Sequence, residues 1–345
     1  MQRNDDSGPE GAAGRCVVFG ELLLRLSAPD RGLLLQRPGL DSCFGGAEAN
    51  VAAGLASLGR PAAIVTALPR NRLGDAALAA VRGMGIDCSG VLRTAGRMGL
   101  YFLDSGAGFR PGQVIYDRND SSFARADADR FDWPTLLRGA GRLHLSGITP
   151  ALGAGPAAAA RRAAATAGEL GIPVSFDVNF RPSLWRSPEE APPLLRALAN
   201  EADVLFANAH DIALLTDEAF AGHPEDEQRL VARAFALFPK LKVIASSRRA
   251  MSAADRLSVS VKVNGRDGMA TSPEKTLSNV VDRIGTGDAL AAGVLAGLGP
   301  SHDIARAAEW GLALFCLKHS IPGDASLADM SDLEAFLDAR LDVRR

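Results

Sequence analysis

The chain has 345 residues, of which 47% are hydrophobic and 23% charged, a composition typical of a globular protein with one large core. Lys and Arg number 38 against 40 Asp and Glu, so the formal net charge is −2 and no broad basic surface favours nucleic acid as a partner. None of the four cysteines forms a C-x-x-C pair, so we expect reduced thiols in a cytoplasmic protein rather than a zinc site.

The first 14 residues are polar and lack the apolar stretch of a signal peptide, so we expect residues 1–14 to form a disordered tail. One domain is predicted over residues 15–330, followed by a C-terminal helix or tail over residues 331–345. The longest apolar run, residues 289–298, is shorter than the ~20 residues that a membrane-spanning helix needs. The sequence therefore predicts no association with a membrane.

Short apolar segments alternate with longer helical stretches along the chain. The predicted strands cover residues 16–20, 62–68, 142–147, 173–178, 203–208 and 242–246. Helices are predicted over residues 47–58, 74–84 and 289–298, and helical stretches separate the later strands. Strands that are apolar throughout and alternate with helices indicate an α/β fold, with a mostly parallel sheet covered on both faces.

Two segments, residues 22–38 and 97–118, interrupt this alternation. In the second, YFLD and QVIYDR flank the turn-rich SGAGFRPG, a pattern that predicts a β-hairpin with a loose loop. Strands inserted outside the main pattern can form a small sheet over the main domain. We therefore expect a lid built from two separate parts of the chain.

The most informative run is DRIGTGDALAAGVLAGL, residues 282–298. A glycine-rich turn leads directly into a helix that is apolar on every face and must therefore be buried. The start of such a helix has unpaired amides and a partial positive charge, and so binds anions such as a phosphoryl group. Asp288 stands at this start, and either caps the helix or accepts the proton of an attacking hydroxyl.

The residues DRIGTGDALAAG (282–293) closely resemble the C-terminal signature of the PfkB, or ribokinase-like, carbohydrate kinases. FGGAEANVAAGLASLG (44–59) resembles their other signature, and the resemblance extends over residues 17–324. It implies the ribokinase-like fold, ATP as phosphoryl donor and Mg²⁺ as cofactor, and leaves dependence on a monovalent cation open. It also implies that Asp288 is the catalytic base and that Gly285, Thr286 and Gly287 stabilise the phosphoryl group with their amides.

Within that family, the hairpin 96–118 and FDVNFRPSLW (176–185) resemble the 2-keto-3-deoxygluconate kinases, which implies transfer to the terminal hydroxyl of that sugar acid. A planar guanidinium can hold a carboxylate through two parallel hydrogen bonds, and Arg181 follows a strand at its carboxyl end, where open α/β sheets bind ligands. The resemblance assigns sugar-acid contacts to Gly45, Gly46, Asn50, Tyr101, Tyr116, Arg118 and Arg181. A second role, capping of its helix, stays open for Asn50.

The nucleotide side departs from the family pattern. The usual N-x-x-E motif is matched by Asn208 and by Asp211 in the Glu position, which we expect to contact the metal only indirectly. The usual glycine-rich turn is replaced by VIASSRRAMSAADRLSVSV (243–261). Ser247, Arg248 and Arg249 therefore lie either beside the nucleotide phosphates or in a solvated loop. The resemblance also assigns nucleotide contacts to Gly285 and Gly287, and places His319 near the adenine.

Other functions remain open. One alternative is a kinase of the same fold that phosphorylates ribose, fructose or the galactonate epimer of the keto acid. Another is a non-catalytic protein that binds a sugar acid as a sensor. A dinucleotide-dependent oxidoreductase is disfavoured because ELLLRL, not G-x-G-x-x-G, follows the first strand. We expect a homo-oligomer, with lid strands pairing across a dimer.

Overall fold

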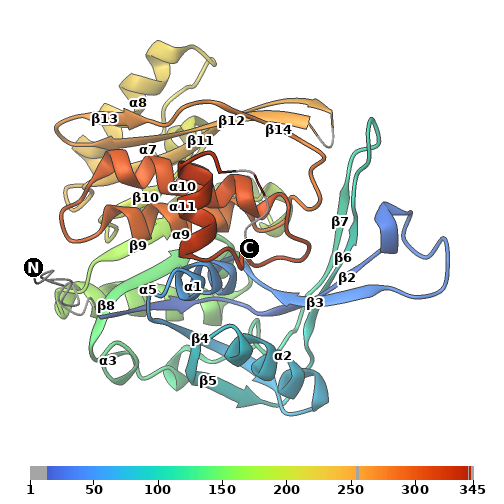
Figure 1. Cartoon of the computed structure of the whole chain (residues 1–345). Coiled ribbons are helices and arrows are strands. Elements are labelled where there is room, and N and C mark those ends of the chain that lie inside the picture. The colour runs from blue at the N-terminus through green and yellow to red at the C-terminus, as the bar shows by residue number, and fades with distance from the viewer. Residues whose placement is uncertain (1–13, 254–255, 341, 343–345) are drawn as a thin grey trace, which may run out of the picture.

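The computed structural model of the chain describes residues 14–253, 256–340 and 342, so the predicted tail lies outside the described residues except for Gly14. Ten strands of this described part form one large sheet (Figure 1). They are β1 (Arg15–Phe19), β4 (Ala62–Pro69), β5 (Asp87–Thr94), β8 (Ala140–Ser146), β9 (Val174–Asp177), β10 (Val204–Phe206), β11 (Val243–Ala253), β12 (Arg256–Gly265), β13 (Met269–Thr271) and β14 (Lys275–Ser278). The order is β13-β12-β11-β10-β9-β8-β1-β4-β5, and β14 pairs with β12.

The sheet is parallel from β5 to β11, which confirms the predicted α/β class. The six predicted strands correspond to β1, β4, β8, β9, β10 and the first part of β11. Beyond residue 246 the chain continues as a strand and pairs with β12 in an antiparallel ladder. Of the two alternatives for Ser247, Arg248 and Arg249, the solvated loop is therefore wrong, because these residues lie in β11.

Helices cover both faces of the sheet, as its apolar strands require. They are α1 (Ala47–Ser57), α2 (Arg72–Gly83), α3 (Trp133–Leu136), α4 (Ile148–Ala151), α5 (Ala154–Glu169), α6 (Ala191–Ala199), α7 (Ala209–Thr216), α8 (Pro224–Leu237), α9 (Thr286–Leu298), α10 (Ile304–Lys318) and α11 (Met330–Leu337). Short 3₁₀ helices cover Pro29–Arg31, Ala128–Arg130, Pro182–Leu184 and Pro188–Glu190. None of the helices in the described ranges is long and apolar enough to cross a bilayer.

Among the described residues, two large hydrophobic cores pack against the large sheet, one on each face. Successive side chains of a strand point to opposite faces, so Val18 of β1 packs in the core under α1, α9 and α10. Its neighbours Val17 and Phe19 pack in the other core, under α5, α6 and α8. This alternation places α1 and α9 on the same face and brings the two sequence signatures together, as the contacts between those helices confirm.

A second sheet of four strands, within the described residues, forms the lid. It contains β2 (Leu23–Ser27), β3 (Asp41–Gly45), β6 (Gly99–Asp104) and β7 (Gln113–Asp117), in the order β3-β2-β6-β7. The predicted hairpin is confirmed as the antiparallel pair of β6 and β7, whereas β3 begins beyond the predicted segment 22–38. Figure 1 shows the lid projecting from one side of the large sheet.

Candidate active site

A cleft of about 990 Å³ lies between the lid and the carboxyl ends of β9, β10 and β11. Most of the residues singled out from the sequence line it: Gly46, Asn50, Tyr101, Tyr116, Arg118, Arg181, Asn208, Asp211, Ser247, Gly285, Thr286, Gly287 and Asp288. Gly45, Arg248 and His319 are not among its lining residues. The fold thus gathers residues from most of the chain's length around one space.

Asp288 stands in the first turn of α9 and faces this cleft. Its Oδ2 accepts a hydrogen bond of 2.7 Å from Nδ2 of Asn50, which α1 brings alongside. Burial raises the pKa of Asp288 to about 7, with smaller upward contributions from Glu48 and Asp324, while the Asn50 hydrogen bond and Arg181 oppose the rise. A carboxylate with this pKa exchanges a proton near neutral pH, as a general base must.

The turn before α9 depends on glycine. Gly285 has φ +75°, and a Cβ there would lie 1.8 Å from the backbone oxygen of Asp324, so no other residue fits without rearrangement. The hydroxyl of Thr286 donates to the carbonyl of Arg283 inside the turn. Gly45 is held in a similar way from the lid, because a Cβ on it would meet Oδ2 of Asp324 at 2.1 Å. Gly45 therefore packs behind Asp324 rather than at the cleft surface.

On the lid side of the cleft, Arg118 is anchored by a buried acid. Nε of Arg118 donates to Glu21 at 2.7 Å, its Nη2 lies 2.5 Å from the same carboxylate oxygen, and Ser121 donates to the other oxygen. Nη1 of Arg118 has no hydrogen-bond partner among the described residues, and its guanidinium carbon lies 5.3 Å from the ring centre of Tyr116. Arg118 therefore presents a fixed cation and one donor edge to a ligand.

The two tyrosines pair directly across β6 and β7, with ring centres 5.9 Å apart. Tyr101 is buried and donates its hydroxyl to Oδ2 of Asp324 at 2.5 Å. Tyr116 is 45% exposed and keeps its hydroxyl free of partners in the described part of the chain. The predicted sugar-acid contact thus has an available hydroxyl at Tyr116, whereas that of Tyr101 is already bonded.

Two further carboxylates, Asp177 and Asp211, line the cleft near Arg181. Burial and the negative charges of Asp288 and Asp211 raise the pKa of Asp177 well above its ordinary range. Burial raises the pKa of Asp211 to about 6, although its Oδ2 caps α7 by accepting from the amide of Asn208. Crowded carboxylates of this kind suit Mg²⁺, which binds one or two acids and completes its shell with water and phosphate oxygens.

No group of three or more His, Cys, Asp or Glu residues in the described ranges is arranged to enclose a metal ion. Asp177 and Asp211 therefore fit an ion that is shared with a phosphate ligand, rather than one caged by the protein alone.

Positive charge gathers where β11 and the turn before α9 line the cleft. Ser247 and Arg249 line the cleft, while Arg248 points elsewhere because successive residues of β11 face opposite sides of the sheet. Burial and the positive charges of Arg283 and Arg181 lower the pKa of Arg249. Like charges held together without an anion are unfavourable, so this group of arginines suits a polyphosphate ligand.

His319 is buried and is not among the residues that line the cleft. It is 3% exposed, and its Nδ1 lies 2.7 Å from the carbonyl of Phe315. Burial lowers the pKa of His319 to about 4. Its role in nucleotide binding stays a prediction.

Four residues with central positions were not singled out from the sequence: Glu21, Asp177, Arg283 and Asp324. Asp177 ends a predicted strand at its carboxyl end, so the rule that placed Arg181 at the ligand edge applied to it as well. Arg283 lies within the motif run itself. Glu21 contacts Arg118, 97 residues away, and Asp324 contacts Tyr101, 223 residues away. No local sequence pattern predicts such pairs.

The model of the pfkB family carbohydrate kinases matches residues 13–326 of the chain. The chain is a pfkB family carbohydrate kinase. The match spans the large sheet, the lid and the cleft, so the resemblance carried by two short motifs is confirmed over residues 13–326.

Among solved structures, this kinase is similar to 2-dehydro-3-deoxygluconokinase from Thermotoga maritima, with 36% identity and a TM-score of 0.90 over 94% of this chain and 99% of that one. It is 29% identical over 328 residues to 2-dehydro-3-deoxygalactonokinase from Haloferax volcanii, covering 93% of this chain and 96% of the relative. It is also 29% identical over 333 residues to 2-dehydro-3-deoxygluconokinase from Bacillus subtilis, covering 95% and 97%.

Proposed function

We propose that this kinase transfers the γ-phosphoryl group of ATP to the terminal hydroxyl of 2-keto-3-deoxygluconate (2-dehydro-3-deoxy-D-gluconate), giving the 6-phosphate and ADP. One observation carries the proposal: Asp288, with its pKa near 7, shares a cleft with the fixed cation Arg118 and with Arg181. A base at a helix start suits phosphoryl transfer to a hydroxyl, and two arginines suit a carboxylate on the acceptor. The similarity to 2-dehydro-3-deoxygluconokinases supports the same substrate.

In the reaction, Asp288 accepts the proton of the attacking hydroxyl as its oxygen bonds to the γ-phosphorus. The bond from that phosphorus to the bridging oxygen breaks, and ADP leaves with the electron pair. The amides of residues 285–287, at the positive end of α9, stabilise the charge on the phosphoryl oxygens. Asn50 favours the ionised form of the Asp288 carboxylate and fixes its direction.

The acceptor is oriented by the lid and by the loop after β9. Nη1 of Arg118 and the guanidinium of Arg181 bind the sugar carboxylate, and the hydroxyl of Tyr116 contacts the ligand from β7. Closure of the lid excludes water and so limits hydrolysis of ATP.

On the donor side, Arg249 and Arg283 bind the nucleotide phosphates together with Ser247. Asp177 and Asp211 would hold Mg²⁺, directly or through water. Bound there, the metal would neutralise charge on the nucleotide phosphates.

A coupled assay of ADP release tests the proposal with 2-keto-3-deoxygluconate, its galactonate epimer, ribose and fructose as acceptors. We expect the sugar acids to be phosphorylated with a kcat/KM at least ~10-fold above that of the neutral sugars. A neutral sugar leaves the arginines without their carboxylate partner, and the loss of such a charged hydrogen bond costs about 1.4 kcal/mol or more. Preference for a neutral sugar would contradict the role given to Arg118 and Arg181.

The galactonate epimer is the second candidate acceptor. The observation in its favour is the similarity to the Haloferax volcanii 2-dehydro-3-deoxygalactonokinase over nearly the full length of both chains. The epimers share the carboxylate and the terminal hydroxyl, so the site described above suits both. The ratio of their kcat/KM values decides which is the better substrate.

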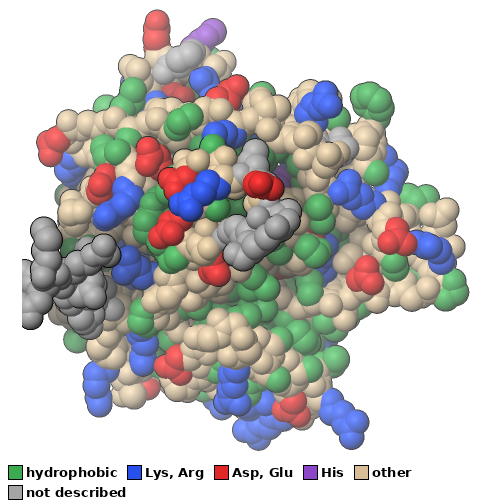
Figure 2. Space-filling model, in the orientation of Figure 1, with side chains coloured by type: hydrophobic (Ala, Val, Ile, Leu, Met, Phe, Trp, Pro, Cys, Tyr) green, Lys and Arg blue, Asp and Glu red, His purple; other side chains and the backbone are tan. Residues whose placement is uncertain are grey.

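We propose that the lid also forms a dimer interface. Its outer ends carry exposed apolar side chains, with Phe109 98% and Leu35 73% exposed, and Figure 2 shows hydrophobic side chains at both ends of the lid. Light scattering after size exclusion tests this, and Phe109→Asp is expected to shift a dimer toward monomer.

Four free thiols and the use of ATP support a cytoplasmic location. Dependence on a monovalent cation is tested separately, by exchange of K⁺ for tetramethylammonium in the assay.

A further inference from the structure

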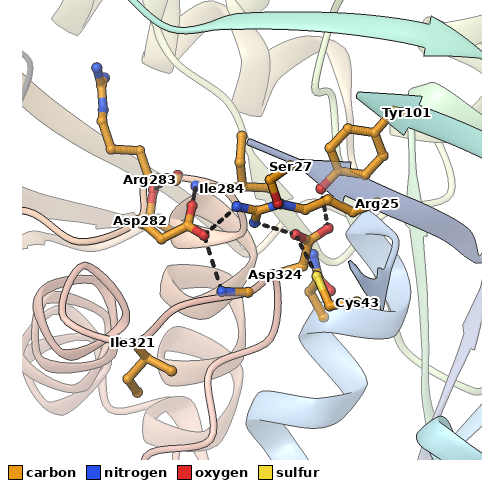
Figure 3. A network of polar contacts seen from close by, with 12 residues as sticks. Arg25, Ser27, Cys43, Tyr101, Asp282, Arg283, Ile284, Ile321 and Asp324 are labelled. Atoms are coloured by element: carbon orange, nitrogen blue, oxygen red, sulfur yellow. Dashed lines mark hydrogen bonds and ion pairs between the residues drawn. The ribbon is translucent and has the colours of Figure 1, made fainter. Parts of the chain in front are cut away.

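A buried group of charges connects the lid to the turn that precedes α9. We call it the Arg25 cluster, and define it as Arg25, Tyr101, Asp282 and Asp324 (Figure 3). Nη2 of Arg25 lies 2.7 Å from Asp282, and its Nη1 lies 2.9 Å from Asp324. The hydroxyl of Tyr101 donates to the second oxygen of Asp324. The guanidinium of Arg25 therefore bridges two carboxylates that are 42 residues apart in the chain.

The cluster is almost completely shielded from water. Arg25 is 4% exposed, Asp282 6% and Asp324 3%. Nε of Arg25 also donates to Ser27 Oγ, so each nitrogen of its guanidinium has an assigned partner. Buried charges are stable only when paired and hydrogen-bonded in good geometry, so the members of this cluster fix one another's positions.

Both acids hold the turn that carries the catalytic amides. Oδ1 of Asp282 accepts from the amide of Ile284 at 3.0 Å, and its Oδ2 accepts from the amide of Gly323 at 3.1 Å. The backbone oxygen of Asp324 packs against Gly285 so closely that no side chain fits between them. Asp282 thus holds the start of the turn, and Asp324 holds it at Gly285.

The lid contributes three of its strands to the same cluster. Arg25 lies on β2 and Tyr101 on β6, and Gly45 at the end of β3 packs against the carboxylate of Asp324. Arg25 itself does not line the cleft, so it has no access to a ligand there. Any effect of Arg25 on the reaction must therefore pass through the residues it holds.

We propose that Arg25 is a positioning residue for phosphoryl transfer, whose guanidinium sets the turn 285–287 and the lid at the spacing the reaction needs. The proposal rests on the proposed kinase function. Tyr101 acts in the same way, through Asp324, rather than as a direct contact of the sugar acid. A buried ion cluster often adds little stability over apolar packing, but its hydrogen bonds fix the orientation of the groups that make them. Phosphoryl transfer requires such fixed orientation, because the acceptor hydroxyl and the anion site must be aligned.

The substitution Arg25→Lys tests the proposal because it keeps the positive charge but cannot bridge both carboxylates with a planar fork. We expect kcat to fall roughly 10-fold to 10²-fold, the effect of a displacement of about 1 Å, while KM for ATP and for the sugar acid stays within about threefold. Tyr101→Phe is expected to lower kcat by a smaller factor, again with little change in KM.

Arg97→Lys is the matched control, since Arg97 is paired with Asp117 on the exposed surface of the lid and takes no part in the cluster. Its kinetic constants are expected to equal those of the unmodified chain. A folded Arg25→Lys variant with unchanged kcat would overturn the proposal. So would a Tyr101→Phe variant that raises KM for the sugar acid at constant kcat, because Tyr101 would then be a direct contact.

Amide hydrogen exchange provides a test that needs no turnover. In Arg25→Lys we expect faster exchange in two peptides together, residues 99–104 of the lid and residues 283–288 of the turn, with no such change in Arg97→Lys. Faster exchange in the lid peptide alone would show that the cluster does not couple the two. If the unmodified chain phosphorylates no sugar or sugar acid, the proposed function fails, and this exchange experiment still decides whether Arg25 couples lid and turn.

Discussion

On the proposed acceptor side of the cleft, the two principal charged side chains have partners within the protein: Asp288 is hydrogen-bonded to Asn50, and Arg118 is paired with Glu21. On the donor side, Arg249 and Arg283 form no ion pair with any residue that the structure describes. The first arrangement is fixed before a ligand arrives, and its groups lose little freedom on binding. Arg249 and Arg283 on the second side carry like charges, which become more favourable when phosphates lie between them.

This difference indicates how each side of the cleft distinguishes its substrate from similar molecules. A pre-positioned acceptor side suits discrimination between sugar acids by geometry and hydrogen bonding. A donor side held mainly by charge suits a polyphosphate, whose binding then depends on ionic strength. Changes on the acceptor side should consequently have the larger effects.

The largest effect is expected from Asp288→Asn, which preserves shape and removes the base. We expect kcat to fall roughly 10²-fold to 10⁴-fold, measured as ADP release with saturating substrates. The substitution should also raise the thermal midpoint at pH 8. Burial raises the pKa of Asp288 from its ordinary 3.8 to about 7, so ionisation of this carboxylate removes stability as pH rises between those values, and Asn avoids that loss.

An Asp288→Asn variant that retains more than about a tenth of the original kcat would contradict a base worth 10²-fold or more. The thermal midpoint serves as the folding control, because a misfolded variant would show a lower midpoint rather than a higher one.

The next largest effect is expected from Arg118→Lys. Lysine keeps the charge but loses the planar edge that Glu21 fixes, so KM for the sugar acid should rise about 10-fold to 10²-fold, the worth of one charged hydrogen bond. KM for ATP should change little. Equal increases in both KM values would show that the lid as a whole had moved, and would contradict a specific contact.

A third prediction concerns Asn50→Ala and the pH dependence of kcat/KM for the sugar acid. Asn50 donates to the ionised carboxylate of Asp288 and so opposes the rise of its pKa. Without that donor the pKa of Asp288 rises further, and the pH at which kcat/KM is half-maximal should move upward by up to about one unit, the equivalent of one ordinary hydrogen bond. A midpoint that stays in place would mean that the bond does not act on the titrating group.

The smallest effect is expected from Arg249→Ala on the donor side. Loss of one partly screened cation should raise KM for ATP by about three- to tenfold at low salt, and less at high salt. KM for the sugar acid should be unchanged. Arg248→Ala is the matched control on the same strand, because Arg248 does not line the cleft.

Much of the fold followed from local patterns. The apolar run of residues 16–20 predicted a buried strand, and the paired tyrosines of residues 101 and 116 lie in the hairpin that SGAGFRPG predicted. The limit at Arg248 and Arg249 is one of register. The sequence left both residues either beside the phosphates or in a solvated loop, whereas on a strand only one of two neighbours can face the cleft.

The Arg25 cluster shows why part of the site was beyond the sequence. Arg25 and Asp324 are separated by 299 residues, and their pairing exists only because the lid folds onto the loop after α10. Asp282 stood within the motif run, yet nothing local indicates that it faces a lid residue. Local periodicity predicts strands and helices, whereas pairs of charges from distant segments require the tertiary fold.

The pH dependence of kcat/KM tests the central claim, that Asp288 is a base poised near neutral pH, most directly, because kcat/KM reports the pKa of the free enzyme. The account predicts that kcat/KM for the sugar acid rises with pH to a plateau, with a midpoint near pH 7, and that the residual activity of Asp288→Asn has no such midpoint. A midpoint that persists in Asp288→Asn would assign the titrating group to another residue and would contradict the account.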